Sequence, residues 1–127
     1  MAQDGRILVA DDESIIREFV AEVLEEYEVI HAVDGQDAID KIPDVKPDLI
    51  ITDIKMPVKG GNEVIKFAKR FDARIPVIVI TGYTSLDIAN ECVRLGADGF
   101  LSKPFTIAQL RQEVNRCIEG RHDAAGM

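Results

Sequence analysis

The stretch ITDIKMP, residues 51–57, decides how this chain is organised. Apolar β-branched residues lead through Thr52 into a single acidic residue, Asp53. This pattern predicts a buried strand that ends in a carboxylate, after which the chain turns outward into a loop at Pro57. Burying the charge of Asp53 is costly unless another group pairs with it or uses it. The rest of the sequence must therefore supply a partner for this carboxylate.

Apolar runs of the same kind recur along the chain, and segments of helical periodicity separate them. Strands are expected at residues 6–10, 28–33, 49–53, 76–80 and 99–102. Helices are expected at residues 14–27, 36–42, 63–71, 86–95 and 107–119, with the second ended by Pro43. Capping residues are expected at Asn62, at Thr84 or Ser85, and at Thr106. Strands that are apolar throughout are buried on both faces, which is typical of a parallel sheet covered by helices.

The alternation of strands and helices predicts an α/β fold with helices on both faces of a five-stranded parallel sheet. The pattern leaves the order of the strands open, and a doubly wound sheet of order 2-1-3-4-5 is our prediction. Ligand sites in such sheets lie beyond the carboxyl ends of the strands, here between strands 1 and 3. We expect one domain over residues 1–127, with a core of about 6–119 and a flexible C-terminal tail.

The composition narrows the class of protein. Hydrophobic residues make up 46% and charged residues 30%, as in soluble globular domains. Lys+Arg 15 against Asp+Glu 23 gives a net charge of −8, which argues against direct binding of nucleic acid. No apolar run can span a bilayer or form a signal-peptide core, so a cytoplasmic protein without membrane contact is expected. Cys92 and Cys117 fall on apolar helix stripes and are expected to be buried, reduced thiols.

Polar side chains stand at the carboxyl ends of four predicted strands: Asp11 and Asp12, Asp53, Thr81 and Lys103. Because parallel strands end at one edge of the sheet, these residues should converge. Clustered carboxylates repel one another, and a hard cation such as Mg²⁺ would remove that conflict. A carboxylate can accept a phosphoryl group, whose oxygens an ammonium, a hydroxyl and a metal can hold. The set therefore predicts phosphoryl transfer to an aspartate.

Each of these residues also has a structural explanation when it is taken alone. Asp11 and Asp12 could be the acidic start of a helix, and Asp53 could be a turn residue. Lys103 could be a solvated surface lysine. A purely structural account needs five coincidences at one edge of one sheet, so we favour the phosphoryl-transfer site.

Four motifs make the sequence recognisable: VADDE (9–13), ITDIKMP (51–57), VITGY (79–83) and LSKPF (101–105). In this order they resemble the receiver domain of two-component response regulators, over residues of about 6–119. The resemblance implies a flavodoxin-like (βα)5 sandwich. It also implies that Asp53 accepts a phosphoryl group from a sensor histidine kinase or a histidine phosphotransfer protein. The chain would then catalyse only its own phosphorylation and dephosphorylation.

The same resemblance assigns roles to the residues that match the motifs. Asp11, Asp12 and Asp53 would bind Mg²⁺, with the backbone carbonyl of Lys55 as a further ligand. Lys103 would contact the phosphoryl group. The peptide bond from Lys103 to Pro104 would be cis.

The resemblance also implies a switch. Thr81 would move towards the phosphoryl group, and Phe100 would turn inward to fill the space. The face made by the fourth helix, the fifth strand and the fifth helix would then change its contacts with a downstream protein target or with a second copy of the chain. Lys55 and Tyr83 flank the site, and we expect them to modulate the lifetime of the phosphoryl group.

Three other functions fit the sequence less well. A flavodoxin-like cofactor binder would need a phosphate-cradling loop after the first strand, where Asp11 and Asp12 would repel phosphate. An aspartyl-phosphate hydrolase would need an acid or base two residues after Asp53, where Lys55 stands. A degenerate receiver that only binds proteins would not need the full set of site residues.

Overall fold

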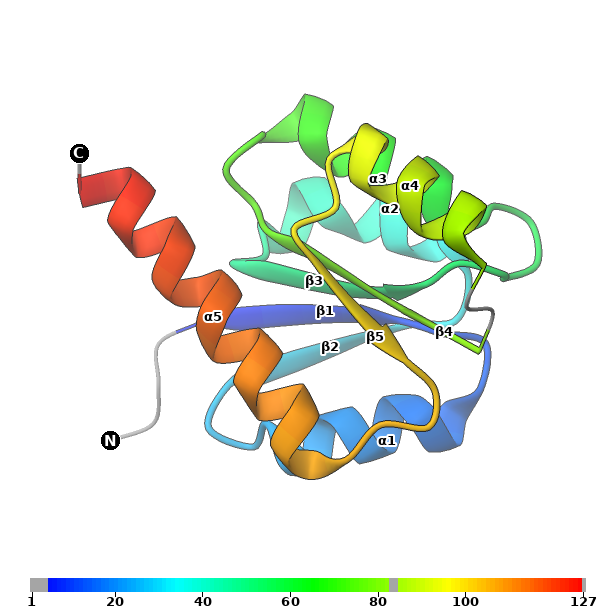
Figure 1. Cartoon of the computed structure of the whole chain (residues 1–127), viewed down its shortest axis with the longest axis horizontal. Coiled ribbons are helices and arrows are strands. Elements are labelled where there is room, and N and C mark those ends of the chain that lie inside the picture. The colour runs from blue at the N-terminus through cyan, green and yellow to red at the C-terminus, as the bar shows by residue number, and fades with distance from the viewer. Residues whose placement is uncertain (1–4, 83–84, 127) are drawn as a thin grey trace.

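The computed structural model describes residues 5–82 and 85–126 and shows five strands and five helices in alternation there (Figure 1). The strands are β1 (Arg6–Ala10), β2 (Glu28–Ala32), β3 (Leu49–Asp53), β4 (Val77–Thr81) and β5 (Gly99–Ser102). The helices are α1 (Ser14–Val23), α2 (Gly35–Val45), α3 (Gly61–Phe71), α4 (Leu86–Leu95) and α5 (Ile107–Gly126).

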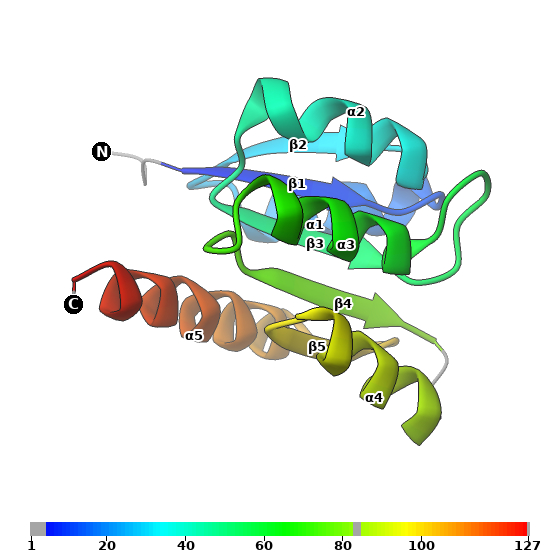
Figure 2. The same cartoon turned by 90° about the horizontal axis from the view of Figure 1, so that it is seen from above.

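The sheet confirms the predicted order. All neighbouring strands are parallel, in the order β2-β1-β3-β4-β5. Ala10 pairs with Thr52, and Asp53 pairs with Ile80, so the ends of β1, β3 and β4 are level. Figure 2 shows β5 at one edge of the sheet and β2 at the other. This register brings the polar strand ends to one edge of the sheet.

Two apolar cores lie on opposite faces of the sheet. One joins β-strand side chains to α1 and α5, through residues such as Val20, Leu110 and Val114. The other joins the alternate strand side chains to α2, α3 and α4, through residues such as Ile42 and Ile65. Figure 1 shows the same division of the helices between the two faces. Strands β3 and β4 are buried at every residue, which explains their uninterrupted apolar sequences.

The two cysteines are buried free thiols, as predicted, one in each core. Burial raises the pKa of Cys92 and raises that of Cys117 to about 11. Both side chains therefore act as small apolar groups in the packing of the helices. In the part of the chain that the structure describes, no helix has the length and the apolar character needed to cross a membrane.

Several helix boundaries differ from the predictions. Helix α2 passes through Pro43 and ends at Val45, because proline removes only one hydrogen bond near the end of the helix. Helix α1 stops at Val23 instead of continuing to residue 27, and Arg111 of α5 donates a 2.6 Å hydrogen bond to the Val23 carbonyl. Helix α5 continues to Gly126, beyond residue 119, where the sequence predicted its end.

Two of the three predicted helix N-caps are confirmed by the structure. The Ser85 side chain accepts a hydrogen bond from the Ile88 amide at the start of α4. Thr106 and Gln109 form a reciprocal capping box at the start of α5, with hydrogen bonds of 3.1 and 2.9 Å. The prediction of a cap at Asn62 is wrong, because α3 begins at Gly61, two residues earlier than predicted, with Gly60 as its N-cap.

Candidate functional site

Lys103 is the centre of the site. Its ammonium nitrogen, Nζ, donates hydrogen bonds to Asp11 Oδ2 at 3.0 Å and to Asp53 Oδ2 at 3.0 Å. A third hydrogen bond reaches Glu13 Oε1 at 3.1 Å. These residues come from the segments that follow β1 and β5 and from the last position of β3. The fold thus brings together groups that are as much as 92 positions apart in the sequence.

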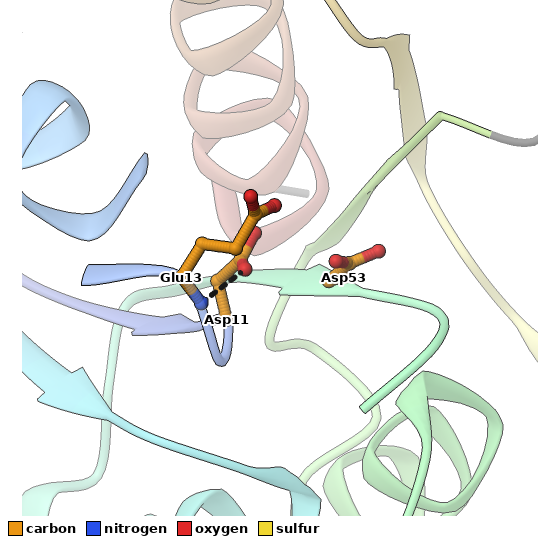
Figure 3. A group of neighbouring side chains, drawn as sticks. All are labelled: Asp11, Glu13 and Asp53. Carbon is orange, nitrogen blue, oxygen red and sulfur yellow. Dashed lines mark hydrogen bonds between the residues drawn. The ribbon is translucent and has the colours of Figure 1, made fainter. Parts of the chain in front are cut away.

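The two aspartates are also fixed by their neighbouring backbone. Asp11 Oδ1 accepts a hydrogen bond from the Glu13 amide at 2.9 Å, which Figure 3 shows as a dashed line. Asp53 Oδ1 accepts one from the Ile54 amide at 2.7 Å. In each carboxylate, one oxygen therefore accepts a hydrogen bond from a backbone amide and the other accepts one from Lys103. This arrangement fixes the orientation of both carboxylates towards the same space.

Most of the charged side chains of this site are buried, and burial affects the pKa values of Asp11 and Lys103. The side chains of Asp11, Asp53 and Lys103 are 0%, 9% and 17% exposed, whereas that of Glu13 is 58% exposed. Burial raises the pKa of Asp11, and this effect outweighs the lowering effect of its hydrogen bonds from Glu13 and Lys103. Burial alone would lower the pKa of Lys103, but hydrogen bonds to Asp11 and Asp53 raise it above its ordinary value. Lys103 is therefore a permanent cation between buried acids.

Three carboxylates form a group that could hold a metal ion. One ligand oxygen from each of Asp11, Glu13 and Asp53 lies within 4.8 Å of the others. Figure 3 shows Asp11 and Glu13 side by side after β1, with Asp53 at the end of β3. Carboxylate oxygens are hard ligands that suit Mg²⁺. The donor set therefore fits the cation expected from the sequence.

The structure brings together three of the predicted site residues, Asp11, Asp53 and Lys103. Asp12 is exposed and lies outside the carboxylate group found among the described residues, so its role as a ligand stays a prediction. Glu13 occupies that group instead, and the sequence offered one signal for it, its place in the acidic run after β1.

Thr81 lies where the sequence places it, buried at the end of β4. Its carbonyl oxygen accepts a 2.8 Å hydrogen bond from the Lys103 amide. The strand end that carries Thr81 therefore also holds the backbone of Lys103. The peptide bond from Lys103 to Pro104 is cis, as predicted.

The remaining predicted residues are Phe100, Lys55 and Tyr83. Phe100 is half-buried and packs against the core beneath α2, α3 and α4, and its amide donates to Glu113 Oε2 at 2.9 Å. Lys55 is exposed in the loop after Asp53. Tyr83 lies outside the described residues. The proposed switching and modulating roles of these residues stay predictions.

Arg17 also contacts the site, although it was not among the predicted site residues. Its Nη1 donates a 2.6 Å hydrogen bond to the Asp11 carbonyl, and its Nε donates to His31 Nδ1 at 3.3 Å. The guanidinium thus fixes the backbone at Asp11 from the β2 side. Helical periodicity separates buried from exposed faces, but it does not show which exposed side chain folds back onto a neighbouring strand.

The loop after Asp53 is tightly packed by two glycines. A Cβ atom on Gly35 would lie 2.0 Å from the Lys59 carbonyl oxygen, and one on Gly61 would lie 2.3 Å from the Asp53 carbonyl oxygen. Between them, Val58 has a φ of 68°, which is rare for a β-branched residue. The Lys59 amide donates to the Pro57 carbonyl across this turn at 2.8 Å. Backbone contacts on both sides therefore determine the path of the loop.

Comparison with known proteins agrees with this geometry. The family model for the response regulator receiver domain matches residues 7–115. The chain is 37% identical to Sporulation initiation phosphotransferase F of Bacillus subtilis (strain 168), over 89% of this chain and 93% of that protein.

Solved structures share the whole fold. A CheY-like response regulator receiver domain protein from Methanospirillum hungatei JF-1 superimposes with a TM-score of 0.91 at 27% identity, covering 96% of this chain and 99% of that one. The beryllofluoride-activated NtrC4 receiver domain dimer gives a TM-score of 0.85 at 34% identity, covering 91% and 98%. The chain therefore belongs to the response regulator receiver domain family, and its acidic pocket fits the phosphoacceptor role of these domains in two-component signalling.

Proposed function

We propose that Asp53 accepts a phosphoryl group from a phosphohistidine on a sensor histidine kinase or a histidine phosphotransfer protein. The observation that carries this proposal is the ammonium of Lys103, bonded at 3.0 Å to both Asp53 and Asp11 at the carboxyl edge of the sheet. It places a fixed cation beside the carboxylate that would react. The name of the relative from Bacillus subtilis, a phosphotransferase, is consistent with such a transfer.

In the proposed reaction an oxygen of Asp53 attacks phosphorus and forms a carboxyl–phosphate bond. The phosphorus–nitrogen bond of the phosphohistidine breaks, and its electron pair stays on the imidazole nitrogen, which takes up a proton. Lys103 stabilises negative charge on a phosphoryl oxygen, and the Thr81 hydroxyl holds another after a short movement. The chain acts only on its own aspartate, so its catalysis is confined to its own phosphorylation and dephosphorylation.

Magnesium completes the proposed site. Asp11, Asp12 and Asp53 would hold it, together with the Lys55 backbone carbonyl. When bound, Mg²⁺ would neutralise charge on the carboxylates and on the phosphoryl oxygens. The neighbouring carboxylate oxygens of Asp11 and Asp53 support this assignment.

The proposed output is a change of surface at α4, β5 and α5. Phosphorylation would draw Thr81 towards the phosphoryl group and let Phe100 turn inward, which shifts a two-state population. A downstream protein or a second copy of the chain would bind the altered face, and the dimer of the activated NtrC4 receiver is consistent with the second case. Lys55 and Tyr83 would set how long the phosphoryl group survives.

Replacing Asp53 with asparagine tests the acceptor. Incubation with acetyl phosphate and Mg²⁺ should add one phosphoryl group to the wild-type protein, and none to Asp53→Asn, because an amide is not a nucleophile here. Intact mass spectrometry measures the product. Asp87→Asn, in the first turn of α4, is the matched control and should be modified like wild type. Uptake by Asp53→Asn, or none by wild type, would show that the assignment is wrong.

Magnesium should stabilise the folded protein because the acids that bind it are grouped only in the folded state. At about a hundred times its dissociation constant, Mg²⁺ should raise the midpoint of thermal unfolding by roughly 10 °C. Differential scanning calorimetry with and without a chelator measures the shift. Asp53→Asn should show a clearly smaller shift. An unchanged melting curve at high Mg²⁺ would rule out the proposed metal site.

A further inference from the structure

The ammonium of Lys103 has no N–H left for another acceptor. A lysine ammonium offers three N–H donors. Asp11, Asp53 and Glu13 accept from it at 3.0, 3.0 and 3.1 Å. A phosphoryl oxygen that arrives at Asp53 therefore needs Lys103 to release one of these carboxylates.

The three carboxylates differ in what their release costs. Asp11 is fully buried and the Asp53 side chain is 9% exposed, so either would be left without its counter-ion away from water. The Glu13 side chain is 58% exposed, and water can replace the lysine as its partner. Exposed ion pairs are also weak, because solvent screens them. Glu13 is thus the partner that Lys103 releases most easily.

We propose that Glu13 is an exchangeable counter-ion that limits the rate of phosphoryl uptake. In the unphosphorylated protein its carboxylate holds the third N–H of Lys103, and it gives up this N–H to the incoming phosphoryl oxygen. Glu13 acts through Lys103 and is a positioning residue. This inference rests on the proposed phosphoacceptor function of Asp53.

Two physical effects act in the same direction. The Glu13 carboxylate competes with the phosphoryl oxygen for one donor, and its negative charge repels the anionic phosphodonor at the mouth of the site. Removing the charge while keeping the shape of the side chain, as in Glu13→Gln, abolishes the repulsion and weakens the competition, because an uncharged amide oxygen is a weaker acceptor than a carboxylate. A direct metal ligand would behave in the opposite way, because loss of its charge would weaken the binding of Mg²⁺.

The test compares Glu13→Gln with wild type in the full chain. The initial rate of modification by acetyl phosphate is measured by intact mass over a series of Mg²⁺ concentrations. At saturating Mg²⁺ we expect Glu13→Gln to react roughly two- to fivefold faster, the range that corresponds to the loss of an exposed ion pair. The Mg²⁺ concentration for half-maximal rate should change by less than about threefold, since a weak exposed interaction is lost.

Glu18→Gln is the matched control. It removes the same charge from an exposed glutamate of α1 that lines a groove with His31 and is not among the three hydrogen-bond partners of the Lys103 ammonium given above. Its rate should equal that of wild type, which separates the local effect from the change in net charge. Asp53→Asn is run in parallel and reports on the acceptor itself.

Three results would overturn the proposal. One is a Glu13→Gln rate at saturating Mg²⁺ that does not exceed that of Glu18→Gln. Another is a large increase in the Mg²⁺ concentration needed without a gain in rate, which would make Glu13 a metal ligand. In both of these cases, phosphoryl uptake by wild type but not by Asp53→Asn would still support Asp53 as the phosphoacceptor. The third is a wild-type protein that takes up no phosphoryl group, which would contradict both the proposed function and this inference.

Discussion

Lys103→Met should destabilise the metal-free protein by about 3 kcal/mol, because removing one partner of a buried ion pair leaves the other charge uncompensated. Asp11 is completely buried, and Asp53 is nearly so. Methionine fills a similar volume but cannot donate a hydrogen bond to either carboxylate. Denaturant unfolding in the presence of a chelator measures the loss.

Magnesium should restore part of this stability, because a bound cation can replace the charge of the missing ammonium among the same carboxylates. The free energy of unfolding of Lys103→Met should therefore rise more on addition of Mg²⁺ than that of wild type. A loss that Mg²⁺ leaves unchanged would contradict the shared use of these acids by lysine and metal.

The same variant should show a defined pH dependence. Burial already raises the pKa of Asp11 in the folded protein, and loss of Lys103 removes a hydrogen bond that lowers it. A carboxyl group with a raised pKa binds its proton more tightly in the folded state, so protonation favours folding. The stability deficit should therefore be complete at neutral pH and should shrink as the pH falls towards the pKa of Asp11.

Lys66→Met is the control for these experiments. Lys66 lies on α3, with its ammonium 3.8 Å from Glu63, and both side chains are about half exposed. The same substitution there should change stability by less than about 0.5 kcal/mol, as expected for a surface ion pair. Equal losses at Lys66 and Lys103 would mean that burial of the site has little energetic consequence.

Gly35→Ala should be the most damaging of the small substitutions, with a loss of about 3 kcal/mol, at the upper end of the cost of overpacking. The added Cβ would lie 2.0 Å from a backbone oxygen of Lys59, and a backbone atom cannot rotate away as a side chain can. Either α2 or the loop that follows Asp53 must move. Chemical denaturation measures the loss of stability.

Gly120→Ala is the matched control, since nothing lies within 4 Å of its added Cβ and the residue is inside α5. Alanine is the better helix former, so this variant should be more stable than wild type by roughly 0.5–1 kcal/mol. If Gly35→Ala unfolds at the same denaturant concentration as wild type, the close contact between α2 and the loop is not formed in solution.

Much of the site could be predicted because of a simple geometric rule. Parallel strands end at one edge of a sheet, so the residues at the ends of β1, β3 and β5 had to converge, and Asp11, Asp53 and Lys103 do. The rule places residues at an edge without giving the direction of their side chains. Both Asp12 and Glu13 follow β1, and only Glu13 turns towards Lys103.

The helix boundaries were less predictable for a related reason. Local signals identified the caps at Ser85 and Thr106, where the hydrogen bonds are between near neighbours. The end of α1 was predicted four residues too late, and there Arg111 of α5 donates a hydrogen bond to the Val23 carbonyl. Interactions between residues far apart in the chain leave no local pattern by which they could be recognised.

The sequence by itself determined the class of the fold, through five apolar runs separated by amphipathic segments, and it determined which acids, hydroxyl and lysine stand at the strand ends. The tertiary structure alone decided which of these groups touch. Lys103 donates hydrogen bonds to three carboxylates, and Arg17 donates one to the Asp11 carbonyl. Gly35, which has no side chain, leaves room for the backbone of Lys59 in the loop after Asp53. The spacing of apolar residues shows whether a position faces water or the core. Individual contacts depend on the distances between segments, and only the packed fold sets these distances.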